Sequence, residues 1–143
     1  MHKINKVEVR NLQMEDYGQL AQSFTRVYAD KDVFWTREQI RKLVTIFPEG
    51  QIVTVVDGRI VGCALSIIVD YDTVKGDHTY AKVTGGETFD THTPNGNILY
   101  GIEVFIHPDY RGLRLARRMY DYRKELCEKL NLKAVSYTHL RAH

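Results

Sequence analysis

The chain has 143 residues, 43% of them hydrophobic and 27% charged, a composition typical of a single globular domain. Its formal net charge is only +2, which argues against nucleic-acid or membrane binding as its main role. No apolar run reaches the length of a membrane span, and the first ten residues lack the apolar centre of a signal peptide. We expect Cys63 and Cys127 to be reduced thiols of a cytoplasmic protein.

The first 50 residues predict one strand and two helices. Residues 6–12 alternate apolar and polar side chains, as a half-buried strand does. Helical spacing of apolar residues follows over 14–28. Thr36 can cap a second helix that runs to about Phe47, before Pro48 ends it.

A hairpin is predicted next. The β-rich runs 51–56 and 59–69 meet at Asp57-Gly58, one of the strongest short-range hairpin signals. From residue 70 to 97 the pattern breaks into Gly, Thr, Asp and His, and no element is predicted. A stretch of this length within a compact domain is typical of a functional or a disordered loop.

The last two elements are a strand over 98–107 and a helix over about 113–130. Strict alternation along the strand would place Glu103, Phe105 and His107 on the face opposite Val104. Asn131 is a suitable left-handed terminator for the helix, and a further strand begins at about residue 132. This order predicts an α/β (α+β) fold with a mixed, mainly antiparallel sheet flanked by helices.

The junction between that strand and that helix predicts an anion site. The apolar run stops at Pro108, and a basic turn containing Gly112 opens directly into the helix. Unpaired backbone N–H groups and the positive end of the helix dipole then converge on one spot, which suits a phosphate or pyrophosphate. Arg111, Arg114 and Arg117 add positive charge around it.

The predicted order of strands and helices, in which residues 104–112 lead into a long amphipathic helix, resembles that of the GNAT family of acetyl-CoA-dependent N-acetyltransferases. The family signature, Arg/Gln-x-x-Gly-x-Gly/Ala, is matched at Arg111 and Ala116, whereas Arg114 replaces the central glycine. The resemblance implies an acyltransferase that moves an acetyl group from acetyl-CoA to a small-molecule or peptide amine. It implies no metal, no nucleic acid and no membrane partner.

The likeness extends to a subgroup in which the acetyltransferase domain precedes a carbon–nitrogen hydrolase domain on one chain. The segments that carry it are 47–51, 68–70, 78–79, 91–92 and 97–101. A fused hydrolase is therefore a possible partner in a longer protein. The alternative function is a non-catalytic domain that binds coenzyme A and regulates the hydrolase.

The resemblance assigns the cofactor-binding residues. The turn and the helix start would hold the diphosphate, and the strand before them would pair with the pantetheine arm as an added strand. The residues concerned are Val104, Phe105, Ile106, Arg111, Gly112, Leu113, Arg114, Leu115, Ala116 and Arg117.

Glu103 is the candidate catalytic base. Attack of an amine on a thioester needs a neutral amine, and therefore a base that removes its proton. It also needs a hydrogen-bond donor for the developing oxyanion, and the backbone N–H near Val104 is the candidate for that donor. A partly apolar setting would favour the protonated carboxyl and so suit a base at working pH. The alternative is an ordinary ion-pair partner. His107 is expected to be exposed or to cap the turn, and His78 and His92 lack the spacing of known metal ligands.

The last nine residues, 135–143, differ in pattern from the rest and resemble the in-frame translation of a transposase adaptor used in sequencing libraries. The alternative is a genuine polar tail. On the first interpretation the domain is residues 1–134, it is incomplete at its C-terminus, and the fragment is inactive. The residue that protonates the leaving thiolate would then lie beyond it.

Overall fold

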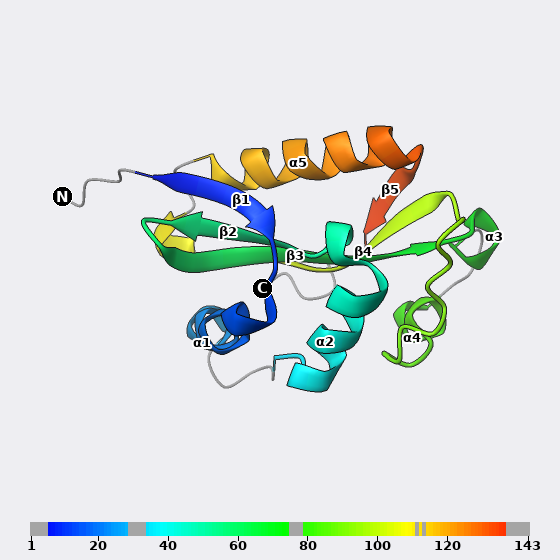
Figure 1. The fold of residues 1–143 in the computed structure, drawn as a ribbon, viewed down its shortest axis with the longest axis horizontal. Helices are drawn as coiled ribbons and strands as arrows, with labels where there is room; N and C mark the ends of the chain where they lie inside the picture. The colour runs from blue at the N-terminus through cyan, green and yellow to red at the C-terminus, as the bar shows by residue number, and fades with distance from the viewer. Residues whose placement is uncertain (1–5, 29–33, 75–78, 111, 113, 137–143) are drawn as a thin grey trace.

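The computed structural model describes residues 6–28, 34–74, 79–110, 112 and 114–136. A five-stranded sheet lies between two helical layers (Figure 1). The strands are β1 (Val7–Asn11), β2 (Ile52–Val56), β3 (Arg59–Val69), β4 (Ile98–Ile106) and β5 (Lys133–Ser136). The helices are α1 (Tyr17–Tyr28), α2 (Arg37–Ile46), α3 (Tyr71–Val74), α4 (Tyr80–Thr84) and α5 (Leu115–Leu130). Short 3-10 turns lie at Met14–Asp16, Pro48–Gly50 and Pro108–Tyr110.

The order of strands across the sheet is the order along the chain, β1-β2-β3-β4-β5. The first four strands are antiparallel, and β5 is parallel to β4. The predicted hairpin is confirmed between β2 and β3. Asp57 and Gly58 both have positive φ, 48° and 81°, which is the conformation that a two-residue turn between twisted strands needs. The predicted mixed, mainly antiparallel sheet is therefore confirmed.

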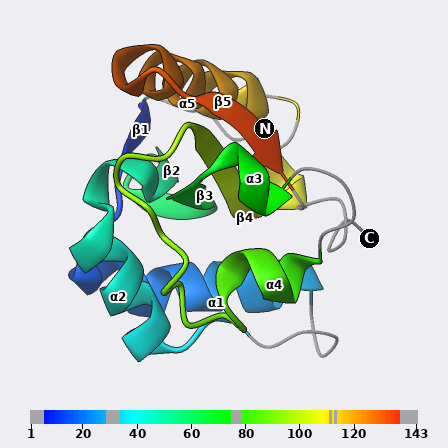
Figure 2. The same ribbon diagram turned by 90° about the vertical axis from the view of Figure 1, so that its right-hand side faces the viewer.

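One helical layer consists of α1, α2 and α4 (Figure 2). The larger core cluster lies between these helices and the sheet, and Leu20, Phe24, Ile40 and Leu43 are completely buried in it. Thr36 caps α2 as predicted, because its side chain accepts a hydrogen bond from the Gln39 N–H, and the Gln39 side chain accepts one from the Thr36 N–H.

α5 covers the opposite face of the sheet (Figure 1). Leu115, Met119 and Leu126 are buried against it, and Cys127 is buried beside them. Asn131 ends the helix in the left-handed conformation, with φ of 56°. The predicted terminator is thus confirmed, and it turns the chain toward β5.

Glu103 and Phe105 lie on the face opposite Val104, as predicted, but the strict alternation expected along β4 is interrupted at Ile102. Glu103 pairs with Leu65 and Gly101 with Ser66, so Ile102 is an extra residue and forms a β-bulge. The bulge reverses the alternation. Glu103 and Phe105 therefore share the α1 and α2 face with Ile98 and Tyr100, whereas Val104 and Ile106 face α5.

The stretch from 70 to 97 is more ordered than predicted, because α3 and α4 lie within it. Thr79 caps α4, and Gly85 ends it with φ of 65°. Val83 and Phe89 then enter the larger core cluster. The segment from 79 to 97 therefore packs against the domain as part of the helical layer that contains α1 and α2.

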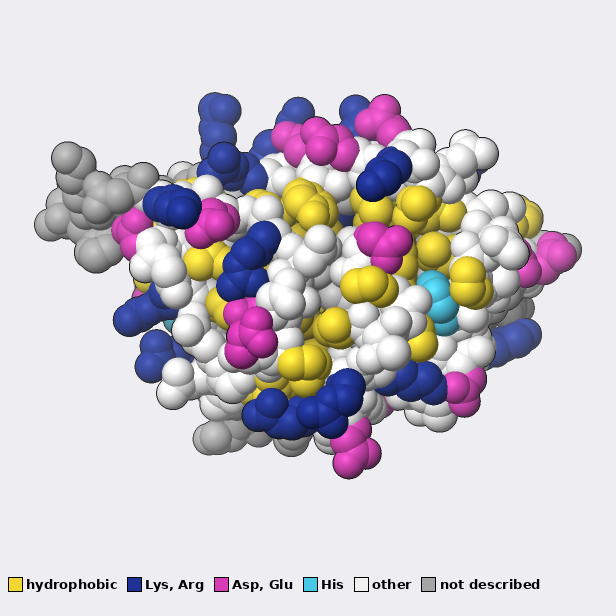
Figure 3. Space-filling model, viewed as in Figure 1, with side chains coloured by type: hydrophobic (Ala, Val, Ile, Leu, Met, Phe, Trp, Pro, Cys, Tyr) yellow, Lys and Arg dark blue, Asp and Glu magenta, His cyan; other side chains and the backbone are white. Residues whose placement is uncertain are grey.

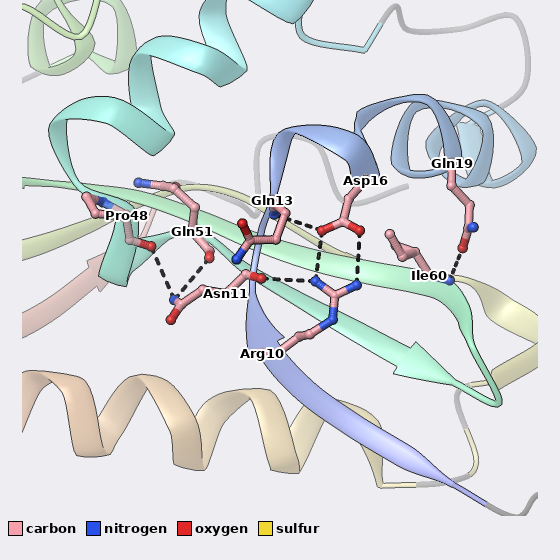
Figure 4. Close-up of polar contacts among 8 residues, drawn as sticks. All are labelled: Arg10, Asn11, Gln13, Asp16, Gln19, Pro48, Gln51 and Ile60. Carbon is pink, nitrogen blue, oxygen red and sulfur yellow. Dashed lines mark hydrogen bonds and ion pairs between the residues drawn. The ribbon is translucent and has the colours of Figure 1, made fainter.

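Polar side chains fix the end of β1 to its neighbours (Figure 4). Arg10 binds both carboxylate oxygens of Asp16, at 2.8 and 3.0 Å. The Asn11 side chain donates hydrogen bonds to the carbonyl oxygens of Pro48 and Gln51. Burial alone would raise the pKa of Asp16, but its hydrogen bonds with Arg10 and the Gln13 N–H outweigh burial and lower that pKa. The turn between β1 and α1 is thus held by a charge-assisted pair.

Gln51 is completely buried and replaces a missing strand partner of β3. Its Nε2 donates to the carbonyl oxygens of Phe47 and Ser66 at 2.9 and 2.8 Å. Its Oε1 accepts a hydrogen bond from the Ser66 N–H at 3.0 Å. One side chain therefore satisfies both backbone groups of Ser66 where β2 no longer runs beside β3.

Charge on the face seen in Figure 1 is mixed, since basic and acidic side chains are interspersed around apolar ones (Figure 3). None of the helices in the described ranges is long and apolar enough to span a membrane. Cys63 and Cys127 are both free and buried. β5 includes the backbone of Val135 and Ser136, and the rest of the predicted non-native tail, 137–143, lies outside the described residues.

Candidate functional site

The C-terminal half of β4 has one strand neighbour. Val104, Phe105 and Ile106 pair with β3, whereas the pairing with β5 on the other edge ends at Gly101. Within the described residues, no strand occupies that second edge of β4 beyond Gly101. Among the described residues, this second edge of β4 beyond Gly101 thus has no strand neighbour, and an extended ligand is a candidate partner for its backbone.

This open edge of β4 leads, through the turn at 108–110, to the N-terminus of α5. The Arg118 N–H bonds back to the carbonyl oxygen of Arg114, the N-cap residue of α5. By helix geometry the N–H groups of Leu115, Ala116 and Arg117 point out beyond the helix end. The Arg114 side chain makes no capping hydrogen bond. The helix end thus offers donors and a positive dipole to an anion, as the sequence predicts.

Arg114 and Arg117 line a surface depression together with Asp121. Arg117 Nε lies 3.3 Å from Asp121 Oδ1, one helical turn further on. Both side chains are exposed, so this ion pair is weak and can be exchanged for a stronger anion such as a phosphate. The depression is therefore cationic at the helix end, and its geometry fits the predicted role of both arginines.

Arg114 adopts a left-handed backbone conformation, with φ of 60° and ψ of 25°. This conformation costs an ordinary L-residue roughly 1–2 kcal/mol, and glycine adopts it freely. The glycine of the family signature is therefore explained by the turn itself. Arg114 supplies positive charge here at the expense of backbone strain.

We expect Arg114→Gly to raise the free energy of unfolding by about 0.5–1 kcal/mol, since the relief of strain exceeds the entropy that glycine adds to the unfolded chain. Urea denaturation measures this change. The matched control is Lys124→Gly, at an exposed position inside α5, which should lower stability by about 1 kcal/mol. Equal losses in the two variants would show that the turn at Arg114 carries no strain.

Glu103 lies at the start of the open part of β4, on the face toward α2. Its side chain is 1% exposed, and its Oε1 accepts a hydrogen bond from Trp35 Nε1 at 3.1 Å. The carboxyl is thus surrounded by the larger core cluster, as a base in an apolar setting requires. The contact with Trp35 joins residues 68 positions apart and carries no local sequence signal.

His107 caps the turn after β4. Its Nδ1 accepts a hydrogen bond from the Asp109 N–H at 3.2 Å, and its ring packs edge-on against Tyr110. The prediction of a turn-capping histidine is confirmed. His107 therefore shapes the approach to the helix end.

His92 has a structural role that the sequence does not reveal. Its Nδ1 accepts a hydrogen bond from the Ile68 N–H at 3.0 Å, and its ring stacks on Phe47. This acceptor role requires a neutral ring. Burial lowers the pKa of His92, against smaller opposing effects of the Glu49 carboxylate and a backbone hydrogen bond with Ile46.

We expect the domain to lose stability when His92 becomes protonated. Since its folded pKa lies below the ordinary 6.5, the unfolded chain binds this proton first as the pH falls. Stability is therefore complete above about pH 6.5 and falls below it by at most about 1.4 kcal/mol per pH unit. His92→Asn keeps an acceptor for the Ile68 N–H and removes the titration. Urea denaturation at several pH values should thus give a flatter profile for this variant than for the wild type.

Two predicted site residues, Arg111 and Leu113, lie outside the described residues. Gly112 between them is exposed, and a Cβ added there would meet no atom within 4 Å. Within the ranges that the structure describes, no three His, Cys, Asp or Glu side chains gather in a way that could hold a metal ion. The candidate site therefore consists of the edge of β4, the N-terminus of α5 and Glu103.

Comparison with known proteins decides the family. The model of the acetyltransferase (GNAT) family matches residues 7–143. The chain belongs to this family. The GNAT domain is also 33% identical over 135 residues to the probable hydrolase YhcX of Bacillus subtilis (strain 168), covering 91% of the chain and 25% of that protein. It is 30% identical over 96 residues to the uncharacterized N-acetyltransferase YkwB of the same strain, covering 67% of the chain and 42% of that protein.

The fold of the GNAT domain is shared with solved structures. The loading GNATL domain of CurA from Lyngbya majuscula superposes with a TM-score of 0.74 at 21% identity, covering 92% of this chain and 64% of that one. This likeness confirms the GNAT-like fold. The GNAT domain spans about a quarter of the length of YhcX and less than half that of YkwB. The match to YhcX agrees with the resemblance to acetyltransferase–hydrolase fusion proteins.

Proposed function

We propose that this GNAT domain transfers the acetyl group of acetyl-CoA to an amine acceptor. The observation that carries the proposal is the open β4 edge beyond Gly101, which leads directly to the uncapped N-terminus of α5. An extended amide-containing arm followed by a diphosphate matches this pair of features in order and in chemistry. YkwB, named an N-acetyltransferase, supports the same reaction class.

The residues divide this task between them. The backbone of Val104, Phe105 and Ile106 would bind the pantetheine arm, as strand partners do. The diphosphate would be held by the turn and helix start, that is by Arg111, Gly112, Leu113, Arg114, Leu115, Ala116 and Arg117. Bound acetyl-CoA supplies an activated acyl group as a thioester.

Glu103 would act as the general base that removes a proton from the acceptor amine. Its burial among apolar side chains keeps bulk water away from the carboxylate. The backbone N–H near Val104 would donate to the oxyanion. Since Glu103 is only 1% exposed, we expect the amine to reach it through a bridging water or after a local movement.

A second candidate is a non-catalytic domain that binds coenzyme A and regulates a fused carbon–nitrogen hydrolase. The same burial of Glu103 favours this candidate, because a carboxyl enclosed in the core can have a purely structural role. The match to YhcX, named a probable hydrolase and about four times as long as the aligned region, favours it as well. Both candidate functions use the β4 edge and the N-terminus of α5 to bind coenzyme A. They differ in whether the thioester bond of acetyl-CoA is broken.

Binding and turnover measured side by side test the proposal. Calorimetry with coenzyme A reports binding. Thiol release from acetyl-CoA in the presence of an aminoglycoside, a polyamine or a peptide with a free α-amine reports turnover. Binding with acceptor-dependent thiol release supports the transferase, and binding without release from any amine supports the regulatory domain. Absence of binding would contradict both candidates.

A further inference from the structure

The chain between α4 and β4 runs beside α2 and is anchored at two points (Figure 2). At its start, Val83 of α4 is completely buried in the larger core cluster. At its end, the Thr93 N–H donates to the Ile68 carbonyl oxygen at 2.7 Å, next to the hydrogen bond between His92 and the Ile68 N–H. Residues 85–91 therefore form a loop between two anchors on the rest of the domain.

The backbone of the 85–91 loop is strained. Gly85, Gly86, Glu87 and Phe89 all have positive φ, between 62° and 68°. Glycine adopts this conformation freely, but it is unfavourable for Glu87 and Phe89. Phe89 is nevertheless only 1% exposed, so burial of its ring in the larger core cluster offsets the strain. Because the two contributions oppose each other, opening of this loop should cost less free energy than unfolding of the sheet.

Phe89 packs on the residue that contacts the candidate base. Its ring centroid lies 5.5 Å from that of Trp35. Trp35 in turn donates its indole N–H to Glu103 Oε1 at 3.1 Å. Trp35 and Glu103 are 4% and 1% exposed, so both are closed off from solvent. Movement of Phe89 away from Trp35 would therefore uncover a face of the indole, on the way from solvent to the carboxyl.

An ion pair ties the loop to α2. The Lys42 ammonium donates a hydrogen bond to the Asp90 carboxylate, next to Phe89 in the chain. The side chains of Lys42 and Asp90 are 38% and 73% exposed, so the pair can be removed without disturbing the core. Exposed ion pairs contribute little to global stability. This pair can therefore adjust how often the loop opens without deciding whether the domain folds.

We propose that residues 85–91 form a gate over Glu103, with Phe89 as its plug, and that the gate opens to admit the acceptor amine. The admission of the amine rests on the proposed function, whereas the opening of the loop does not depend on it. In the structure the gate is closed. Opening withdraws Phe89 from Trp35, while the anchors at both ends of the loop stay in place. Such a movement gives an amine access to a carboxyl that is otherwise buried.

Hydrogen exchange at Trp35 measures the opening directly, because the chain contains one tryptophan and its indole N–H gives a single NMR signal. We expect this N–H to exchange faster than the most protected amides of β3 and β4, since the gate opens without unfolding of the sheet. Asp90→Asn should speed the exchange about two- to fivefold, because an exposed ion pair that favours the closed gate is lost. Glu8→Gln, which removes an exposed ion pair at the start of β1, is the matched control and should leave the rate unchanged.

A second variant tests whether the ion pair causes the effect. Lys42→Gln should speed indole exchange as much as Asp90→Asn, and the double variant should add nothing further, since both changes remove the same interaction. An indole N–H that exchanges as slowly as the sheet amides in the wild type and in Asp90→Asn would overturn the proposal. Equal acceleration in Asp90→Asn and in Glu8→Gln would overturn it as well.

Turnover tests whether the open gate admits the acceptor. In Asp90→Asn we expect kcat/KM for the amine to rise by the same factor as the exchange rate, because a larger fraction of the protein is open. KM for acetyl-CoA should stay unchanged, since the β4 edge and the N-terminus of α5 are not part of the gate. Faster indole exchange with an unchanged kcat/KM for the amine would show that the amine enters elsewhere, and would overturn the role of the gate.

The two measurements separate failure of this proposal from failure of the proposed function. If indole exchange depends on the pair of Lys42 and Asp90 but no amine is acetylated, the loop opens and the transferase assignment is wrong. If amines are acetylated but the indole exchanges only when the sheet unfolds, the transferase stands and the gate is wrong. The exchange measurement needs no acceptor, and Asp90 is exposed, so the variant on which it depends should fold.

Discussion

Glu103→Gln is expected to lower kcat for acetyl transfer by about 100-fold or more, because general bases contribute roughly 10²–10⁴-fold to such steps. The amide can still accept the hydrogen bond from Trp35, so the fold and the affinity for coenzyme A should be retained. The measurement is acceptor-dependent thiol release under saturating acetyl-CoA, with coenzyme A binding followed by calorimetry.

The matched control is Glu125→Gln, which removes an exposed carboxylate of α5 and should leave kcat unchanged. Equal turnover in Glu103→Gln and in the wild type would show that another group accepts the proton. Glu103 would then be a structural carboxylate of the core. Binding of coenzyme A by both proteins without turnover in either would favour the regulatory alternative.

Gln51→Leu is expected to lower the free energy of unfolding by about 3 kcal/mol or more. Leucine fills a similar volume but leaves the N–H and carbonyl of Ser66 and the carbonyl of Phe47 without the partner that Gln51 provides. Each buried polar group that loses its hydrogen bond costs about 1–3 kcal/mol. Urea denaturation with a two-state fit measures the loss.

Gln22→Leu, at an exposed position of α1, is the control and should change stability by no more than about 0.5 kcal/mol. A loss of less than about 1 kcal/mol in Gln51→Leu would mean that the backbone of Ser66 finds other partners, such as water. In that case the contacts of Gln51 would not be needed to hold β3 beside the 3-10 turn at Pro48–Gly50.

Elements with strong local signals could be predicted from the sequence. Asp57-Gly58 specifies a tight turn because both residues tolerate positive φ, and Thr36 specifies a helix start because its side chain caps its own helix. The strand, turn and helix that form the candidate anion site at Arg114 belong to the same class, since they are consecutive. Local chemistry determines all three, so a single sequence is sufficient to predict them.

Features that depend on pairing between distant segments could not be predicted in this way. The bulge at Ile102 arises from the register with β3, and no residue near it marks the shift. Glu103 could be singled out from the sequence as a candidate base, but its hydrogen-bond partner Trp35 lies 68 positions away. Gln51 and His92 likewise stand in for backbone partners of β3, and only the assembled sheet shows which groups need them.

The order of the strands also bears on how the domain is made. Because β1 to β5 lie side by side in the order of synthesis, each strand adds to an edge that earlier residues have already formed. No strand has to be inserted between two others. The antiparallel part can therefore assemble while the ribosome is still adding residues, since its pairings are mostly between neighbours along the chain. β5, which needs α5 as a crossover, docks last, so the part of the sheet next to the candidate binding edge of β4 is completed after the antiparallel part.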